Sequence, residues 1–459
     1  SHYMQAYWMS AARGSELEIF PFVWLIGEQK WIPRESSFLT PPTHHGMLEA
    51  GRWNSMCIVC HATHGNRHTA PAELEQATVA DFGIACEACH GPGEAHVRRH
   101  RNPEESDSDD LIVNPLKLSH ERTSEVCGRC HMSWTFEEPD SLLTFRPGKD
   151  LRSMRRIEMT LSQYWRDGMI RTVGDEFNGL MESPCFQRGT MTCLSCHTLH
   201  QSVDDPRPRD EWTEDLLKPN MRNNEACLAC HEDYRSEDNL LAHTHHPASS
   251  DGSLCYNCHM PNTSYGLLKV SRSHQISSPS VGDFLNGVGR PTACNLCHLD
   301  KTLEWTNQTL ADWYGQKRTA DTGSWPEHAL SIEVALRGDA AQRALIAWHM
   351  GWEPARKASD DQWLAPYLAI LMQDDYPAVR FIAERSLSYL AGYDDISYDP
   401  EMPADKRKRA VREITRRWNK NRVTLDRPEL FLNPGGSLQQ QKIDQLLRTR
   451  DHSAISLDE

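Results

Sequence analysis

The feature of this sequence that most restricts its fold is a pair of cysteines separated by two residues, which occurs seven times. Fourteen of the 15 cysteines belong to these CxxC pairs. Such spacing is compatible with a disulfide scaffold, with zinc ribbons or with covalent attachment of haem. The pairs are Cys57/Cys60, Cys86/Cys89, Cys127/Cys130, Cys193/Cys196, Cys227/Cys230, Cys255/Cys258 and Cys294/Cys297.

The residue after each pair separates these three alternatives. Only 23 of the 459 residues are histidine, so finding one in seven places out of seven by chance is on the order of one in a billion. A zinc site does not require a histidine at that position. The repeated CxxCH motif therefore predicts seven covalently bound haem c groups. The seven histidines are His61, His90, His131, His197, His231, His259 and His298.

The spacing of the motif suits haem chemistry. Positions i and i+3 lie on the same side of a helix, so both thiols can add to the two vinyl groups on one porphyrin edge. The histidine that follows can then bind the iron from the proximal face. Because this attachment occurs outside the cytoplasm, we expect a periplasmic or extracellular protein whose export signal is not in this sequence. The porphyrins would also supply apolar volume to a chain that is only 39% hydrophobic.

Sixteen further histidines are candidates for the second axial position, and thirteen of them precede His298. His200 lies only three residues after His197, so it cannot reach the opposite face of the same iron and should bind a neighbouring haem. The same reasoning applies to His64 and, less tightly, to His96. The other candidates are His44 or His45, His120, one of His243, His245 and His246, and His274.

The cysteine distribution predicts three regions. Residues 1–50 contain no haem motif, and the stretch EIFPFVWLIGEQKWIP (18–33) predicts a β-hairpin. Residues 51–299 form the predicted heptahaem domain, with short helices and long loops around stacked haems. Residues 300–459 contain no cysteine, and two similar segments, 340–350 and 377–390, predict helical HEAT-like repeats. The predicted fold class is mainly α.

The charge of the chain restricts its partners. A formal net charge of −15 disfavours nucleic acid and anionic membrane surfaces. No apolar run approaches the length of a membrane-spanning helix. We expect redox proteins as partners.

The motifs, taken in order, resemble those of exported multihaem cytochromes c, particularly the octahaem and hydroxylamine-oxidoreductase-like cytochromes. The stretches that carry the resemblance are RWNSMCIVCHATHG, FGIACEACHGPGEAH, CGRCH, MTCLSCHTLH, CLACH, HHPASSDGSLCYNCHMP and GRPTACNLCHLDKTLEWT. The resemblance covers about residues 50–315, and the HEAT-like character extends it. It implies bis-histidine haems in stacked and perpendicular pairs and a role in respiratory electron transfer. When the motifs are matched one by one, the resemblance implies that the distal ligands include His96, His245 or His246, and His274.

The resemblance has two departures. Such cytochromes often carry a further CxxCH near the N-terminus. The presence of an eighth haem, attached to sequence upstream of this chain, is therefore an open alternative. The chain also lacks CxxCK, the lysine-ligated motif of cytochrome c nitrite reductases.

Two functional classes follow from these observations. The first is an electron relay through mostly bis-histidine haems, in respiratory or extracellular electron transfer. The second is an oxidoreductase that acts on a small nitrogen or sulfur compound at one five-coordinate haem. The sequence contains at least as many candidate distal histidines as haem motifs, which favours the relay. Assembly into a larger respiratory complex, or into a polymer through the termini or the helical region, is a further hypothesis.

Overall fold

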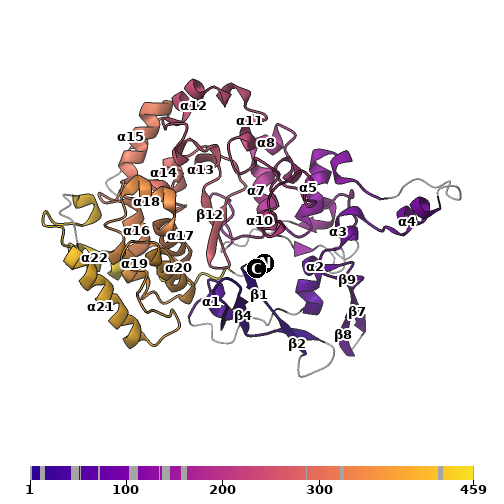
Figure 1. The fold of residues 1–459 in the computed structure, drawn as a ribbon, viewed down its shortest axis with the longest axis horizontal. Coiled ribbons are helices and arrows are strands. Elements are labelled where there is room, and N and C mark those ends of the chain that lie inside the picture. Colours follow the sequence, from indigo (N-terminus) through magenta and orange to yellow (C-terminus); the bar gives the residue numbers. More distant parts are fainter. Residues whose placement is uncertain are drawn as a thin grey trace.

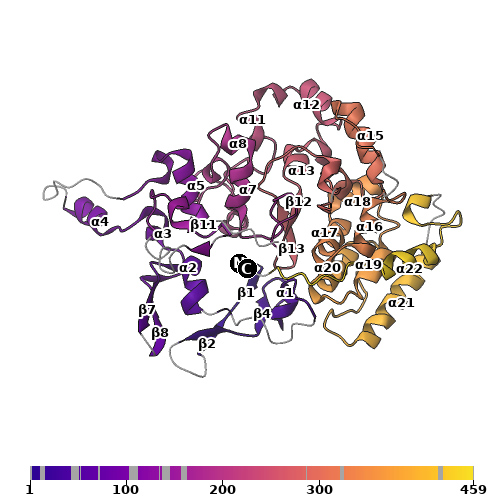
Figure 2. The same cartoon turned by 180° about the vertical axis from the view of Figure 1, so that it is seen from behind.

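The computed structural model describes residues 3–10, 16–42, 51, 53–70, 73–102, 112–133, 135–136, 145–156, 163–285, 287–320, 325–421 and 427–457. Within these ranges the chain is rich in helices, and its sheets contain only two or three strands. This confirms the helix-rich part of the predicted fold. Figures 1 and 2 show the C-terminal helices at one end of the long axis and α4 at the other.

The N-terminal region contains the predicted hairpin. Strands β4 (Phe22–Leu25) and β5 (Lys30–Pro33) pair antiparallel on either side of a turn at residues 26–29. Trp24 lies opposite Trp31, with ring centroids 5.4 Å apart, which is the kind of cross-strand aromatic pair that stabilises a hairpin. The neighbouring elements are β1 (Met4–Gln5), which adds to β4, the pair β2 (Trp8–Ser10) and β3 (Leu17–Ile19), and α1 (Arg34–Ser37).

Each CxxCH motif lies on or beside a short helix. Polar caps begin some of these helices: the Thr292 hydroxyl accepts a hydrogen bond from the Asn295 backbone, and Thr192 forms a capping box with Ser195. One turn of helix is enough to place both cysteines on one side. The motif helices are α2 (Ile58–His61), α3 (Cys86–His90), α5 (His120–Gly128), α9 (Cys193–Cys196), α11 (Glu225–Leu228), α13 (Cys255–His259) and α14 (Ala293–Cys297).

Long loops and small elements connect the motif helices, as predicted. The connecting elements are β6 (Ala62–Thr63), β7 (Asn66–Ala70), β8 (Glu73–Thr78), β9 (Asp81–Phe82), α4 (Glu94–Arg101), β10 (Thr135–Phe136), β11 (Arg155–Arg156), α7 (Glu176–Glu182), α8 (Pro184–Gln187), α10 (Arg209–Thr213), α12 (Glu237–Thr244), β12 (Asn262–Gly266) and β13 (Lys269–Arg272).

The C-terminal region is a stack of packed helices. Helix α17 packs against α16 and α20, and α19 packs against α20 and α21. Small residues allow this close approach: a Cβ on Gly351 of α17 would lie only 2.8 Å from the Ser386 backbone in α20. The helices are α15 (Leu303–Tyr314), α16 (Leu330–Arg337), α17 (Ala340–Gly351), α18 (Glu353–Ser359), α19 (Ala365–Leu371), α20 (Pro377–Ser388), α21 (Ala404–Asn421) and α22 (Gln440–Arg448).

The largest hydrophobic core belongs to these C-terminal helices and also includes N-terminal residues. Val23 and Leu25 of β4 are buried in the same cluster as Leu368 and Phe381. Leu39 also forms a β-bridge with Leu457. The N-terminal strands therefore share a core with the helical region, and the division at residues 50 and 299 stays a prediction. The two similar segments do form helices that pack together, α17 and α20, whereas HEAT-like repetition stays a prediction.

A buried ion pair should contribute strongly to the stability of the helical region. Arg343 binds Asp374 through two hydrogen bonds of 2.7 and 2.9 Å, and both side chains are almost fully buried. Arg343→Ala would leave a buried carboxylate whose remaining ion-pair partner among the described residues is Arg450, so we expect a loss of about 3–5 kcal/mol. Arg409→Ala is the matched control, because it breaks an exposed pair with Asp405 and should cost less than about 0.5 kcal/mol. Urea unfolding followed by far-ultraviolet circular dichroism measures both; equal losses would contradict this assignment.

Candidate haem-binding site

Four of the CxxCH histidines lie opposite a second histidine from another segment of the chain. The ring centroids of each pair are 6.0–6.3 Å apart, and the ring planes are inclined by 6–31°. The pairs are His90 with His200, His197 with His274, His259 with His243, and His298 with His246.

This separation fits an iron between the two rings. An imidazole nitrogen binds a transition metal at about 2 Å, so two rings on opposite sides of one metal have centroids roughly 6 Å apart. The residues present therefore fit axial ligation of haem iron by two histidines. His200 lies three residues after His197 and faces His90 of an earlier motif, which is the arrangement that the spacing argument predicts.

Hydrogen bonds hold the imidazoles in a fixed orientation. A carbonyl oxygen can only accept, so a ring whose Nδ1 faces one carries its proton there and leaves Nε2 as the metal-binding nitrogen. Among the motif histidines, Nδ1 of His90, His197 and His259 donates to the carbonyls of Val113, Asp215 and Ser277 at 2.7, 3.0 and 2.9 Å. His246 and His274 donate in the same way to Thr244 and Arg272, at 2.6 and 3.2 Å.

Burial favours the neutral form of several of these rings. Desolvation disfavours the imidazolium form and lowers the pKa of four of the paired histidines. A neutral imidazole is the form that binds a metal. The four residues are His197, His243, His274 and His298.

The attachment cysteines of different motifs lie near one another. Since thioether bonds would form at these sulfurs, the contacts would bring porphyrin edges together largely in sequence order. Hydrogen bonds join Cys127 to Cys193 and Cys227 to Cys255. The Sγ atom of Cys130 lies 3.8 Å from the Cys60 carbonyl oxygen. The pairs that are near enough for their charges to interact are Cys89–Cys130, Cys196–Cys230, Cys258–Cys294 and Cys258–Cys297.

The profile of the cytochrome c552 family matches residues 60–342, well over half of the chain. The chain belongs to the cytochrome c552 family. It is accordingly a multihaem cytochrome c that binds haem c covalently. The match begins inside the first motif and ends in α17, so it includes all of the later motifs and the first C-terminal helices.

Two curated relatives are similar to parts of this cytochrome. The multiheme cytochrome MtrA of Shewanella baltica is 28% identical over 167 residues, which are 33% of this chain and 44% of the relative. The cytochrome c nitrite reductase subunit NrfA of Nitratidesulfovibrio vulgaris is 26% identical over 181 residues, or 33% of each chain. This cytochrome thus spans less than half the length of either relative.

Two solved structures show a more distant likeness. The outer cell wall cytochrome OcwA has a TM-score of 0.46 and 17% identity, with 90% of this chain and 85% of OcwA covered. The undecaheme cytochrome from the S-layer of Carboxydothermus ferrireducens has a TM-score of 0.33 and 14% identity, with 84% of this chain and 62% of that cytochrome covered.

The structure changes the choice among His243, His245 and His246. Both His243 and His246 face motif histidines, whereas His245 adopts a left-handed backbone with φ of 56° and stacks on Trp313 at 4.4 Å. This geometry favours His243 and His246, rather than His245, as the candidate ligands of the segment. The sequence argument also missed the neighbour that holds His243, because the Tyr314 hydroxyl donates to the His243 carbonyl at 2.8 Å from 71 residues away.

The remaining predicted ligands have other surroundings. His64 is partly buried and lies 3.6 Å from the Glu87 carboxylate, and among the described residues neither of its ring nitrogens has a hydrogen-bond partner. His96 packs against His100 on α4 at 4.5 Å, rather than opposite a motif histidine. His120 lies 3.6 Å from Glu121 and contacts the edge of Phe186.

His44 and His45 lie outside the described residues. Within the described ranges, no histidine ring is paired with the three remaining motif histidines, His61, His131 and His231.

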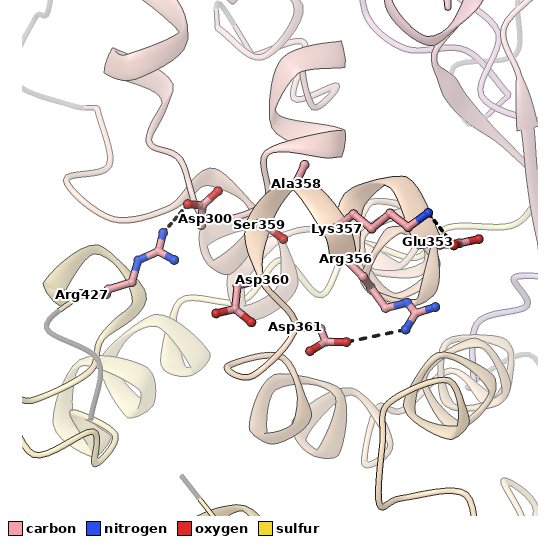
Figure 3. A pocket seen from close by; sticks show the side chains of 9 residues that line it. All are labelled: Asp300, Glu353, Arg356, Lys357, Ala358, Ser359, Asp360, Asp361 and Arg427. Carbon is pink, nitrogen blue, oxygen red and sulfur yellow. Dashed lines mark hydrogen bonds and ion pairs between the residues drawn. The ribbon is translucent and has the colours of Figure 1, made fainter. Parts of the chain in front are cut away.

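A pocket of about 610 Å³ lies in the C-terminal region, lined by residues of α18, by Arg427 and by Asp300, which is two residues after His298 (Figure 3). Its charged side chains pair largely with one another: Lys357 with Glu353 at 2.7 Å, and Arg356 with Asp361 at 3.6 Å. This polar lining is unlike the apolar surface that a porphyrin requires.

The paired arrangement makes a prediction at the AHTHH segment. His243→Ala and His246→Ala should each convert one low-spin ferric haem to high spin, because each removes one axial ligand. His245→Ala is the matched control. Each haem that is low spin in the unaltered protein should stay low spin in this variant. Electron paramagnetic resonance of the ferric proteins measures this. A new high-spin signal with His245→Ala alone would contradict the assignment.

Proposed function

We propose that this cytochrome relays electrons through seven haem c groups, one at each CxxCH motif, most of them bound by two histidines. The observation that carries the proposal is the proximity of attachment cysteines of different motifs. It runs through all seven motifs, because Cys130 approaches the Cys60 carbonyl of the first motif and its charge interacts with Cys89 of the second. A continuous series of neighbouring cofactors is what electron relay requires, whereas a single reactive haem would not need the others.

Shared segments of axial ligands support the same function. The segment 197–200 would serve the haems of the second and fourth motifs, and the segment 243–246 would serve those of the sixth and seventh. Three residues of chain span at most about 10 Å, so irons that share such a segment are held close together.

We also propose an exported location and a binding role for the helical region. Covalent haem attachment occurs outside the cytoplasm, and among the described residues every helix is too short or too polar to cross a bilayer. The packed helices α16–α17 and α19–α20 are compatible with a HEAT-like module that presents a surface to a redox partner.

Haem content and intramolecular electron transfer test the relay. The intact mass should exceed that of the 52.4 kDa polypeptide by seven haems. After pulse reduction by less than one electron per molecule, the electron should redistribute among the haems at a rate independent of protein concentration. Redistribution that slows in proportion to dilution would mean transfer between molecules and would refute the relay. A high-spin haem that binds and turns over a small nitrogen or sulfur compound would instead favour an oxidoreductase.

A further inference from the structure

One motif histidine has a hydrogen-bond partner of a different kind. Nδ1 of His131 lies 2.8 Å from Oε2 of Glu176, whereas Nδ1 of His90, His197 and His259 faces backbone carbonyls. The acceptor at His131 is therefore a carboxylate, and the acceptors at the other three are neutral.

The Glu176 carboxylate is held in this position from several sides. Its other oxygen, Oε1, accepts a hydrogen bond from the Gly174 backbone at 2.9 Å. The next residue, Phe177, donates its backbone N–H to the His131 carbonyl at 2.9 Å. The Phe177 ring packs so closely against Gly128 that a Cβ there would lie 2.4 Å from a ring carbon. Helices α5 and α7 thus fix the carboxylate against the imidazole.

Glu176 also lies near the axial pair of the next motif. Its charge interacts with His274, and both Glu176 and His131 interact with His197. The cysteines of the same two motifs are in contact, Cys127 with Cys193. The carboxylate therefore lies close to two consecutive haem attachment sites.

A carboxylate at this position has a defined electronic effect. When it accepts the Nδ1 proton, it increases the basicity of the imidazole, which then donates more electron density to its metal. A nearby negative charge further favours the more positive, oxidised iron. Hydrogen bonding behind an axial ligand is one of the means by which a protein sets haem potential. A backbone carbonyl has the same geometry without the full charge.

We propose that Glu176 is a positioning residue that lowers the reduction potential of the haem attached at Cys127 and Cys130 below that of haems whose proximal histidines face carbonyls. A smaller effect in the same direction extends to the haem at Cys193 and Cys196. This inference rests on the proposed function, because it requires haem at both motifs. It goes beyond that function by assigning an order of potentials within the relay.

Glu176→Gln tests the proposal, because glutamine keeps an acceptor for His131 and removes the charge. Potentiometry followed by optical and electron paramagnetic resonance spectra should show one haem shifted upward. We expect at least a tenfold change in its ferrous-to-ferric ratio at fixed potential, which corresponds to about 59 mV. A second haem should shift less. Glu182→Gln, at the far end of the same helix α7, is the matched control and should leave both potentials unchanged.

Two results would overturn the proposal: Glu176→Gln with all haems present and unshifted potentials, or equal shifts from Glu182→Gln. If Glu176→Gln assembled with fewer haems, Glu176→Asp would replace it as the test. Aspartate keeps the charge on a shorter side chain, so a smaller upward shift is expected, and an unchanged potential would count against the proposal. Absence of haem from Cys127 and Cys130 in the unaltered protein, shown by the mass of the peptide that contains them, would refute the proposed function separately.

Discussion

The arrangement of residues 51–299 depends on a requirement that two imidazoles from separate segments lie about 6 Å apart, on opposite sides of one iron. His197 and His274 satisfy it across 77 positions of sequence, and His90 and His200 across 110. The hydrophobic clusters of the described haem-bearing part are small, whereas the helical region and N-terminal strands share one large core. Covalent thioethers and iron–histidine bonds would therefore supply much of the long-range cross-linking that apolar packing provides elsewhere, so folding and haem binding should be coupled.

The same requirement explains how a chain with long loops can hold its cofactors in a fixed order. A segment of four residues that donates a ligand at each end would hold two irons together through covalent geometry alone. The proximity of the attachment cysteines would add a second restraint at the porphyrin edges. Since both restraints would act on the cofactors directly, the loops between motifs could be polar and long without changing the spacing of the haems.

The sequence predicted the features that depend on local spacing. The seven motifs and the hairpin of β4 and β5 follow from patterns within about 20 residues, and the paired C-terminal helices follow from two similar segments that begin 37 residues apart. It could not distinguish His243 from His245, because that choice depends on a left-handed residue and on Trp313 and Tyr314 in a later helix. It also gave no signal for Glu176, which is 45 residues from His131 and is one acidic residue among 64. Which carboxylate reaches a given histidine is decided by how α5 packs on α7, and no spacing rule contains that information.

The C-terminal helices participate in the arrangement of the last haem motifs. Helix α14, which carries Cys294 and Cys297, packs against α16, α17 and α18. Its buried Asn295 donates to the Lys301 carbonyl and accepts from the Thr306 hydroxyl, so the start of α15 is fixed to the motif itself. At its other end, α15 supplies the two aromatic residues that hold the 243–246 segment. One helix thus links the seventh CxxCH motif to the segment that carries His243 and His246, the candidate distal ligands of the sixth and seventh motifs.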